Sequence, residues 1–309
     1  MSRPLVSLTL KNFGASYDGF VALRCDEMSV KGNVIGLIGH NGAGKSTLMR
    51  SILGLVPIST GSLETRVQRD ATEKIAVPEQ HMAFCPETGS VFADITVKSY
   101  IELWCRFKQR SVHYYQHEGK QFIEALEVSP LLQKLGRELS KGQRRRVQMA
   151  IGFMMSPELF LLDEPFDGLD VRHSDELAEL LAEESKRRTF IISSHRLDVV
   201  ERIADSIVLL ENGSVRAFGD TSDVCHTIAG DTFHIVGSPD PEDLGTRLQN
   251  HFPTALIHRS GTIISIVGSH DSVGNLKTLT QSWEQTELVI KRVAPTLPDS
   301  VSYHLRQSH

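Results

Sequence analysis

The stretch Gly39-His40-Asn41-Gly42-Ala43-Gly44-Lys45-Ser46-Thr47 decides the fold of the region around it. The apolar run at residues 34–38 precedes it and is short enough to be a buried strand. Apolar residues recur after it at helical spacing, until Gly54 and Pro57 end the pattern. The stretch therefore reads G-x-x-x-x-G-K-S between a strand and a helix, the setting in which this motif binds phosphate.

The residue types in this loop suit the binding of a phosphate chain. Glycines let the backbone turn tightly enough to point several N–H groups at one phosphate chain, with the N-terminus of a helix behind them. Lys45 is placed to reach the outer phosphates, and the Ser46 hydroxyl can ligate the Mg²⁺ that they carry. We therefore expect this chain to bind a nucleoside triphosphate.

The composition is that of an ordinary globular protein. Its 309 residues suggest two domains, at about 150 residues for each. The net charge of −5 argues against a nucleic-acid partner, which would need a basic excess. The 4 cysteines form no C-x-x-C pair, which argues against zinc and for free thiols in a reducing compartment. No run approaches the ~20 apolar residues that span a bilayer, and the N-terminus lacks the apolar core of a signal peptide. We expect a soluble, cytoplasmic protein.

Polar residues follow two further apolar runs. Residues 159–162 read as a buried strand that ends in Asp163 and Glu164, and residues 190–192 read as another that leads to His195. Short strands that alternate with helices predict a mainly parallel sheet, which binds its ligand at the carboxyl ends of its strands. We therefore expect the two carboxylates and the histidine to lie beside the glycine loop.

The segments around these runs carry weaker patterns. Residues 5–11 and 21–30 alternate apolar and polar side chains, which predicts an antiparallel strand pair with Tyr17 in the connecting loop. An Asn-Gly pair at residues 212–213 predicts a tight hairpin. Helical patterns occupy residues 97–109, 122–126, 140–155 and 174–188.

Taken in order, these motifs resemble the ATP-binding-cassette ATPases over about residues 5–220. Leu139-Ser140-Lys141-Gly142-Gln143 is similar to the family's signature, L-S-G-G-Q, at the start of a helix. Residues 159–164 resemble the Walker B strand with its catalytic glutamate, and residues 166–170 resemble the D-loop. The other matches are Tyr17 for the aromatic residue that stacks on adenine, Glu87 for the Q-loop glutamine, and His195 for the switch histidine.

The resemblance implies a fold and a set of site residues. The fold is α/β, a P-loop NTPase of the ABC type with an antiparallel β-subdomain and a helical subdomain, in residues 1–222. The ligands are ATP and Mg²⁺. Glu164 is the general base that activates the attacking water, helped by His195 and Lys45. Oxygen ligands for Mg²⁺ come from Ser46, Glu87 and Asp163. The ATP-binding residues are Tyr17, Gly39, His40, Asn41, Gly42, Ala43, Gly44, Lys45, Ser46 and Thr47.

The family resemblance also implies a dimer. In this family the signature helix points its N-terminus at ATP held by the other protomer. One chain carries one phosphate loop and one signature, so a homodimer with two equivalent sites is the simplest arrangement. Asp170 of the D-loop lies at that interface. The residues that contact ATP across it are Ser140, Lys141, Gly142 and Gln143.

Two residues depart from the family pattern. Lys141 replaces a signature glycine and adds positive charge near the phosphates, and Glu87 replaces the usual glutamine. Activity is expected to survive the change at Lys141, and Glu87 keeps the length and acceptor capacity of glutamine but loses its amide donor. The combination resembles the ATPase subunits of exporters whose membrane partner is a separate ABC-2-type permease. Such a subunit lies on the inner face of the cell membrane. Residues 91–143 then contain the groove for the permease, with Phe92, Tyr100 and Trp104 as candidate lining residues.

The tail after residue 230 reads as a second, small domain. Residues 231–309 show the order β-α-β-β-α-β, which fits a ferredoxin-like α+β fold. Its helices are expected at 241–252, 272–283 and 298–305. The histidines in this tail show no ligand spacing such as H-x₃-H, so we assign it no metal and no chemistry.

Two other functions stay open at this point. One is an importer ATPase whose C-terminal domain regulates transport. The other is a soluble cassette ATPase of translation or DNA repair. Against the latter, only one cassette is present, and the segment between Glu87 and Ser140 is too short for a long coiled coil.

Overall fold

The computed structural model describes residues 3–17, 19–88, 91–268, 276 and 288–307. The chain divides into two compact units, Met1–Gly219 and Asp220–His309. Helix α8 (Thr221–Ala229) lies at the start of the second unit and packs against α12 (Leu297–Gln307), where the Ser300 hydroxyl donates to the Cys225 carbonyl at 3.3 Å. Among the described residues, no helix is both long and apolar enough to cross a bilayer.

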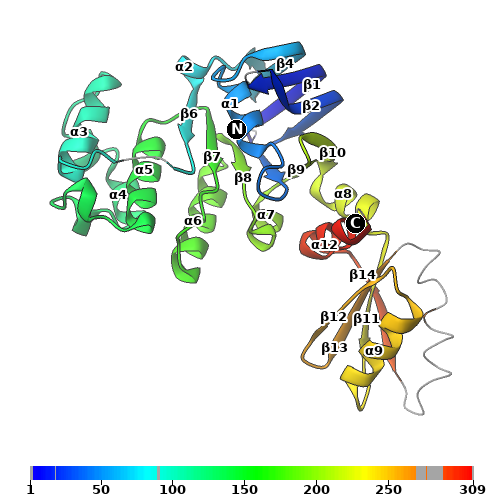
Figure 1. Cartoon of the computed structure of the whole chain (residues 1–309). Helices are drawn as coiled ribbons and strands as arrows, with labels where there is room; N and C mark the ends of the chain where they lie inside the picture. Colours follow the sequence, from blue (N-terminus) through cyan, green and yellow to red (C-terminus); the bar gives the residue numbers. More distant parts are fainter. Residues whose placement is uncertain (1–2, 18, 89–90, 269–275, 277–287, 308–309) are drawn as a thin grey trace. The chain divides into compact units, whose positions relative to one another are not determined.

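The first unit is built on a ten-stranded mixed sheet with the order β5-β4-β1-β2-β10-β9-β3-β8-β7-β6 (Figure 1). Its antiparallel part pairs β1 (Leu5–Tyr17) with β2 (Phe20–Gly32) and β4 (Ile58–Arg69), and β4 with β5 (Thr72–Ile75). The first two strands are longer than the sequence pattern predicts, so Tyr17 is the last residue of β1. Its parallel part consists of β3 (Val34–Ile38), β6 (Met82–Cys85), β7 (Leu159–Asp163), β8 (Thr189–Ser193) and β9 (Ser206–Glu211).

The central parallel strands are buried along their whole length, which explains their uninterrupted apolar sequences. Helix α1 (Lys45–Ile52) packs against β1, β2, β4 and β7, and its Leu48 and Met49 lie in a core shared with Leu8 and Leu37. The predicted hairpin is confirmed: Asn212 and Gly213 both have positive φ between β9 and β10 (Ser214–Asp220).

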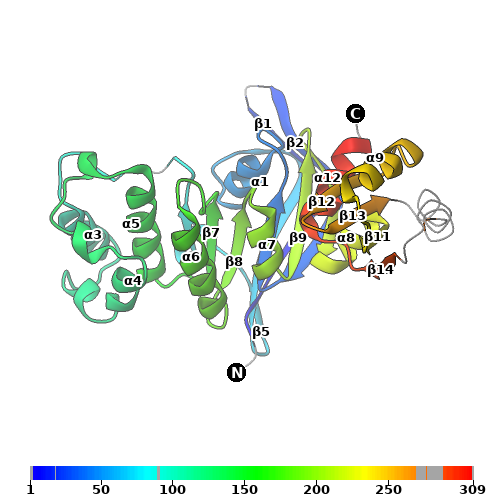
Figure 2. The same cartoon turned by 90° about the horizontal axis from the view of Figure 1, so that it is seen from below.

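A helical part lies beyond the β6 edge of the sheet (Figures 1 and 2). It contains α3 (Val97–Phe107), α4 (Lys120–Ala125) and α5 (Lys141–Met154), with short 3₁₀ turns between them; α2 (Pro78–His81) precedes β6. Phe153 of α5 joins this part to the sheet, because its ring stacks on Phe122 and meets Phe160 of β7 edge-on.

The helices after β7 and β8 are α6 (Val171–Glu184) and α7 (Leu197–Ile203). The sequence pattern placed the start of α6 at Ser174, three residues too late. The helix begins at Val171 because the Asp170 carboxylate caps it, accepting from the His173 backbone N–H at 2.9 Å.

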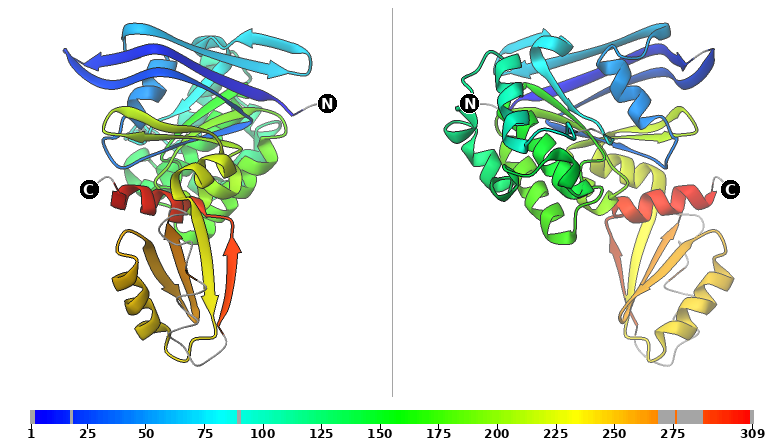
Figure 3. Two further views of the ribbon diagram at one scale, coloured as in Figure 1. Left: turned by 90° about the vertical axis from the view of Figure 1, so that its right-hand side faces the viewer. Right: turned by 60° about the vertical axis from the view of Figure 1, so that its left-hand side comes forward.

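The second unit is a four-stranded sheet with the order β12-β13-β11-β14, and all neighbours are antiparallel (Figure 3). Helix α9 (Pro241–His251) packs on β12 (Leu256–Ser260) and β13 (Ile263–Gly268), burying Leu244 and Leu248. The other strands are β11 (Asp231–Val236) and β14 (Val289–Val293). The helix predicted at 272–283 lies outside the described residues except for Leu276, so the ferredoxin-like assignment stays a prediction.

Candidate active site

The glycine loop lies between β3 and α1, where the sequence pattern places it. A cavity of about 650 Å³ opens above it. Gly39 has φ 148°, and a Cβ there would lie 2.3 Å from the Leu210 carbonyl oxygen, so only glycine fits this turn. The lining residues are Phe20, Val21, Ala22, His40, Asn41, Gly42, Ala43, Gly44, Lys45, Ser46, Thr47, Glu87, Glu164, Asn212 and Gly213.

The sequence predicted only some of the residues that line the cavity beside the glycine loop. Tyr17 is not among the lining residues that the structure describes, whereas Phe20 is. The two residues pair across the β1–β2 turn, and Phe20 is the more exposed, at 72% against 38% for Tyr17. Sequence position alone does not tell which of two aromatic residues on the same turn faces the cavity. The Asn212-Gly213 hairpin also lines the cavity, which its turn signal could not indicate.

Lys45 is buried and held by the loop that precedes it. Its ammonium group donates to the carbonyls of Gly39 at 2.7 Å and His40 at 3.3 Å. It also lies 3.4 Å from Oε1 of Glu164. These contacts aim the charge at the cavity, where a phosphate could replace them.

The two carboxylates at the end of β7 are joined through Ser193, the last residue of β8. Its hydroxyl donates to Oδ1 of Asp163 at 2.5 Å and accepts from the backbone N–H of Glu164 at 2.9 Å. Asp163 and Ser193 are both buried. Sequence reasoning missed Ser193, because a serine at a strand end carries no signal of its own.

Glu164 occupies a strained backbone conformation, with φ 48°. Such strain in a non-glycine residue is typical of functional sites. Its Oε2 accepts from the backbone N–H of His195 at 3.2 Å and lies 2.9 Å from Nδ1 of that ring. Its Oε1 is buried without a hydrogen-bond donor among the described residues and faces the Lys45 ammonium. A water molecule bound at Oε1 would complete this carboxylate's hydrogen bonds.

Glu87 reaches the same cavity from the end of β6. Its loop is fixed by Arg145 of α5, a buried side chain that donates to the carbonyls of Pro86 at 2.6 Å and Glu87 at 2.8 Å. Arg145 is therefore a second residue that sequence reasoning missed. It connects the helix of the signature segment to the loop of Glu87.

The donor set suits Mg²⁺. Ser46 and Glu87 line the cavity, and Asp163 lies next to Glu164 with its Oδ2 not engaged by the Ser193 hydroxyl. Hydroxyl and carboxylate oxygens are the ligands that this hard cation prefers. Two of the three predicted metal ligands thus share the cavity with the predicted base, whereas Asp163 is not among the lining residues but directly precedes that base; the oxygen donors fit the cation.

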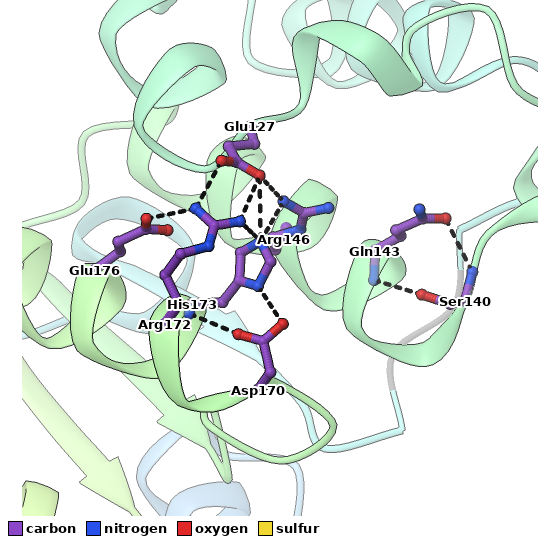
Figure 4. Close-up of polar contacts among 8 residues, drawn as sticks. All are labelled: Glu127, Ser140, Gln143, Arg146, Asp170, Arg172, His173 and Glu176. Carbon is purple, nitrogen blue, oxygen red and sulfur yellow. Dashed lines mark hydrogen bonds and ion pairs between the residues drawn. The ribbon is translucent and has the colours of Figure 1, made fainter.

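The signature segment lies elsewhere. Ser140 caps α5: its hydroxyl accepts from the Gln143 backbone N–H at 3.2 Å, and its own N–H donates to the Gln143 side chain at 3.1 Å (Figure 4). Gly142 packs against the D-loop, where a Cβ would lie 2.6 Å from the Gly168 carbonyl oxygen. None of residues 140–143 lines the cavity over the loop of the same chain.

Lys141 does not point into its own chain's nucleotide cavity. Its ammonium pairs with the Asp167 carboxylate at 2.5 Å, which holds the pKa of Asp167 below its usual value. The positive charge that the sequence suggested for the phosphates is therefore largely matched by a D-loop carboxylate. Asp170, the other D-loop acid, caps α6 and remains exposed.

Comparisons with known proteins agree with this arrangement. The family model described as ABC transporter matches residues 27–167. The ABC-type transporter ATP-binding protein EcsA of Bacillus subtilis is 30% identical over 219 residues, which cover 70% of this chain and 88% of that protein. ATP-binding cassette sub-family A member 9 of Mus musculus is 29% identical over 224 residues, or 70% of this chain, but the match spans only 14% of that relative's length.

A solved structure supports the same assignment. The structure of the ATP binding subunit of an ABC transporter superimposes with a TM-score of 0.61 at 26% identity, covering 71% of this chain and 92% of that one. With the phosphate loop, the paired carboxylates and the signature helix in place, this chain belongs to the ABC transporter ATPase family, whose domain hydrolyses ATP.

Proposed function

We propose that this chain is the ATP-hydrolysing subunit of an exporter that uses a separate ABC-2-type permease. Two copies hold two ATP molecules between them, each bound by the phosphate loop of one protomer and the signature turn of the other. The protein then lies in the cytoplasm on the inner face of the cell membrane. EcsA, to which this chain is 30% identical, is named as an ABC-type transporter ATP-binding protein, which supports the role of ATP-binding component of a transporter.

The chemistry follows from the side chains around the cavity. Glu164 accepts a proton from the attacking water at Oε1, the buried oxygen for which the described residues provide no hydrogen-bond donor. His195 holds the other carboxylate oxygen and so fixes the direction of the base. Lys45 leaves its loop carbonyls to neutralise the outer phosphates. When bound, Mg²⁺ supplies charge neutralisation of the phosphates, and Ser46, Glu87 and Asp163 would hold it.

The sandwich is supported by the separation of the two half-sites. The Ser140 turn is exposed at the N-terminus of the 14-residue helix α5, with backbone N–H groups and a positive dipole end available to an anion. Because that turn does not line its own chain's cavity, a second copy is the simplest source of a phosphate for it.

One observation carries the proposal of a membrane partner. An apolar groove of about 470 Å³ lies between β6, α3 and α5, and Tyr100 and Trp104 line it. Phe92 is not among the lining residues described, but its ring packs edge-on against Tyr100 with centroids 5.4 Å apart. Cys85 and Pro86 line this groove, and the next residue, Glu87, lines the nucleotide cavity. A segment seated in the groove would therefore move a residue of the active site.

Crosslinking in native membranes tests this proposal. The 4 native cysteines are buried, so a cysteine introduced at Lys108, which lines the groove, offers an accessible thiol. Lys108→Cys should crosslink to an ABC-2-type permease, identified by mass spectrometry, whereas Lys120→Cys on the exposed side of α4 should not. An importer permease with an extracytoplasmic binding protein would contradict export. Crosslinking from neither position would contradict a membrane partner and favour the soluble ATPase.

We assign the C-terminal unit no catalytic role. We propose that residues 231–309 form a ferredoxin-like accessory domain, which follows an ATPase domain of residues 1–222 in the sequence. The 4-1-3-2 strand order with antiparallel neighbours supports this, since that is the order expected when two β-α-β halves interleave.

A further inference from the structure

A polar cluster lies to one side of the Ser140–Gln143 turn (Figure 4), and none of its members is among the residues that line the nucleotide cavity. We call it the Glu127 cluster; its members are Glu127, Arg146, Arg172, His173 and Glu176. Glu127 follows the end of α4 with φ 47°. Its carboxylate accepts from Arg146 of α5 at 2.9 Å and from Arg172 of α6 at 2.9 and 3.3 Å. One carboxylate thus contacts two helices that do not belong to its own segment.

His173 extends the cluster to the D-loop. Its Nδ1 lies 2.8 Å from Oδ2 of Asp170, and its Nε2 lies 3.2 Å from Oε2 of Glu127. A guanidinium nitrogen of each arginine lies 3.0 Å from the same Nε2. The ring therefore bridges Asp170, the last D-loop residue, and the carboxylate that receives both arginines.

The cluster is an ion-pair network and not a metal site. Ligand atoms of Glu127, His173 and Glu176 lie within 4.8 Å of one another, which would suit a cation. However, Arg172 donates to Glu127 at 2.9 Å and to Glu176 at 2.6 Å. Its guanidinium already occupies the position between the carboxylates that a metal ion would need.

The two helices joined here carry the two segments expected at the dimer interface. Helix α5 begins directly after Ser140, and α6 begins directly after Asp170. The Lys141–Asp167 pair connects the same two segments near their starts. Positions 141 and 146 are about 7.5 Å apart along a helix. Two attachment points at that separation fix the angle between the segments as well as their distance.

We propose that Glu127 is a positioning residue for ATP-driven dimerisation: it fixes the signature helix to the D-loop helix, so that Ser140 and Asp170 meet the partner protomer as one surface. This inference rests on the proposed sandwich dimer. Glu127 is not among the residues that line the nucleotide cavity and acts through Arg146 and His173. Because the Glu127 side chain is 44% exposed, its ion pairs add little to folding stability. Their effect is therefore on the orientation of α5 relative to α6.

Glu176 offers a matched control. Within the part of the chain that the structure describes, its one partner is Arg172, one turn away on the same helix, so it belongs to the cluster without joining two segments. Glu127→Gln keeps the volume and removes the charge, and Glu127→Ala removes the side chain. Glu176→Gln makes the same charge change at a position that contacts its own helix and, in the described residues, no second segment. All three are made in the full chain.

The experiment measures dimerisation and nucleotide binding separately. Sedimentation velocity with MgATP, in a Glu164→Gln background that slows hydrolysis, gives the dimer dissociation constant. A fluorescent ATP analogue, at protein concentrations below dimerisation, gives the monomer's affinity. We expect Glu127→Ala to weaken the dimer about tenfold, a coupling of ordinary size for contacting charged groups. Glu127→Gln should weaken the dimer less than Glu127→Ala does, and Glu176→Gln should change the dimer dissociation constant little. The monomer's ATP affinity and the melting temperature should change little in all three variants.

The other possible outcomes would contradict either the positioning role of Glu127 or the sandwich dimer on which it rests. Equal weakening by Glu127→Ala and Glu176→Gln would mean that local charge matters and the connection does not. An unchanged dimer with Glu127→Ala, or an equal loss of monomer affinity, would also overturn the positioning role. If the Glu164→Gln parent itself remained monomeric with MgATP, the proposed sandwich would fail and the inference with it. If Glu127→Ala does not fold, the isosteric Glu127→Gln decides.

Discussion

Removing the Ser193 hydroxyl tests how the two strand-end carboxylates are held. Ser193 is buried and contacts both: it donates to Asp163 at 2.5 Å and accepts from the Glu164 N–H at 2.9 Å. In Ser193→Ala the Glu164 N–H keeps a partner, because it also donates to the Ser193 backbone carbonyl at 3.1 Å. The loss therefore falls on the buried Asp163 carboxylate, which is left short of one donor.

The magnitude follows from that contact. A hydrogen bond to a charged group is worth about 1.5–3 kcal/mol. We expect Ser193→Ala to lower the free energy of unfolding by about 2 kcal/mol, which shifts the melting temperature of a unit of this size by about 4–8 °C. Hydrolysis should fall as well, since Glu164 loses a contact that fixes its strained backbone.

The control for this prediction is a second buried serine. The Ser51 hydroxyl on α1 is buried and has no hydrogen-bond partner among the described residues. Ser51→Ala should therefore leave the melting temperature unchanged or raise it slightly. Both variants are measured by calorimetry without nucleotide. Equal melting temperatures for the two variants would refute the reasoning, because they would show that the Asp163 contact contributes nothing.

Four further changes have expected results. Glu164→Gln should slow hydrolysis by at least about 10²-fold and accumulate an ATP-bound dimer; elution as a monomer with MgATP in gel filtration would count against the sandwich. Lys45→Ala should abolish ATP binding, and retained affinity in calorimetry would contradict the phosphate-loop assignment. The hydrogen bond from Lys141 lowers the pKa of Asp167. The pair therefore stabilises the fold fully at pH values above the ordinary aspartate pKa, and this stabilisation is lost as the pH falls through the lowered pKa. Lys141→Gln should thus cost no more than about 1 kcal/mol at pH 7 and progressively less as the pH falls through the lowered pKa of Asp167, and a pH-independent difference in urea midpoints would disprove it. A chain ending at Gly219 should keep measurable basal ATP turnover; a folded but inactive fragment would mean that the second unit completes the catalytic dimer.

The local features were predictable because they are contiguous. The glycine loop needs only its own backbone, a strand before it and a helix after it, and residues 39–47 lie where the pattern placed them. The strands at 159–163 and 189–193 were recognisable because full burial selects uninterrupted apolar runs. Capping by Ser140 was predictable for the same reason, since a cap contacts residues of its own first turn. The start of α6 was missed because the Asp170 cap resembles an ordinary loop aspartate.

The sequence alone was enough to recognise the family and its contiguous phosphate loop, and it predicted Asp163 as a metal ligand and Glu164 as the base. The contacts between distant segments became visible only in the folded chain: Ser193 with Asp163, Arg145 with the Glu87 loop, and Glu127 with α5 and α6. The physical reason is distance along the chain. These partners are separated by tens of residues, and a lone serine, arginine or glutamate has no periodicity that reveals its contact. Strand order and helix packing bring them together, and neither is encoded in any single segment.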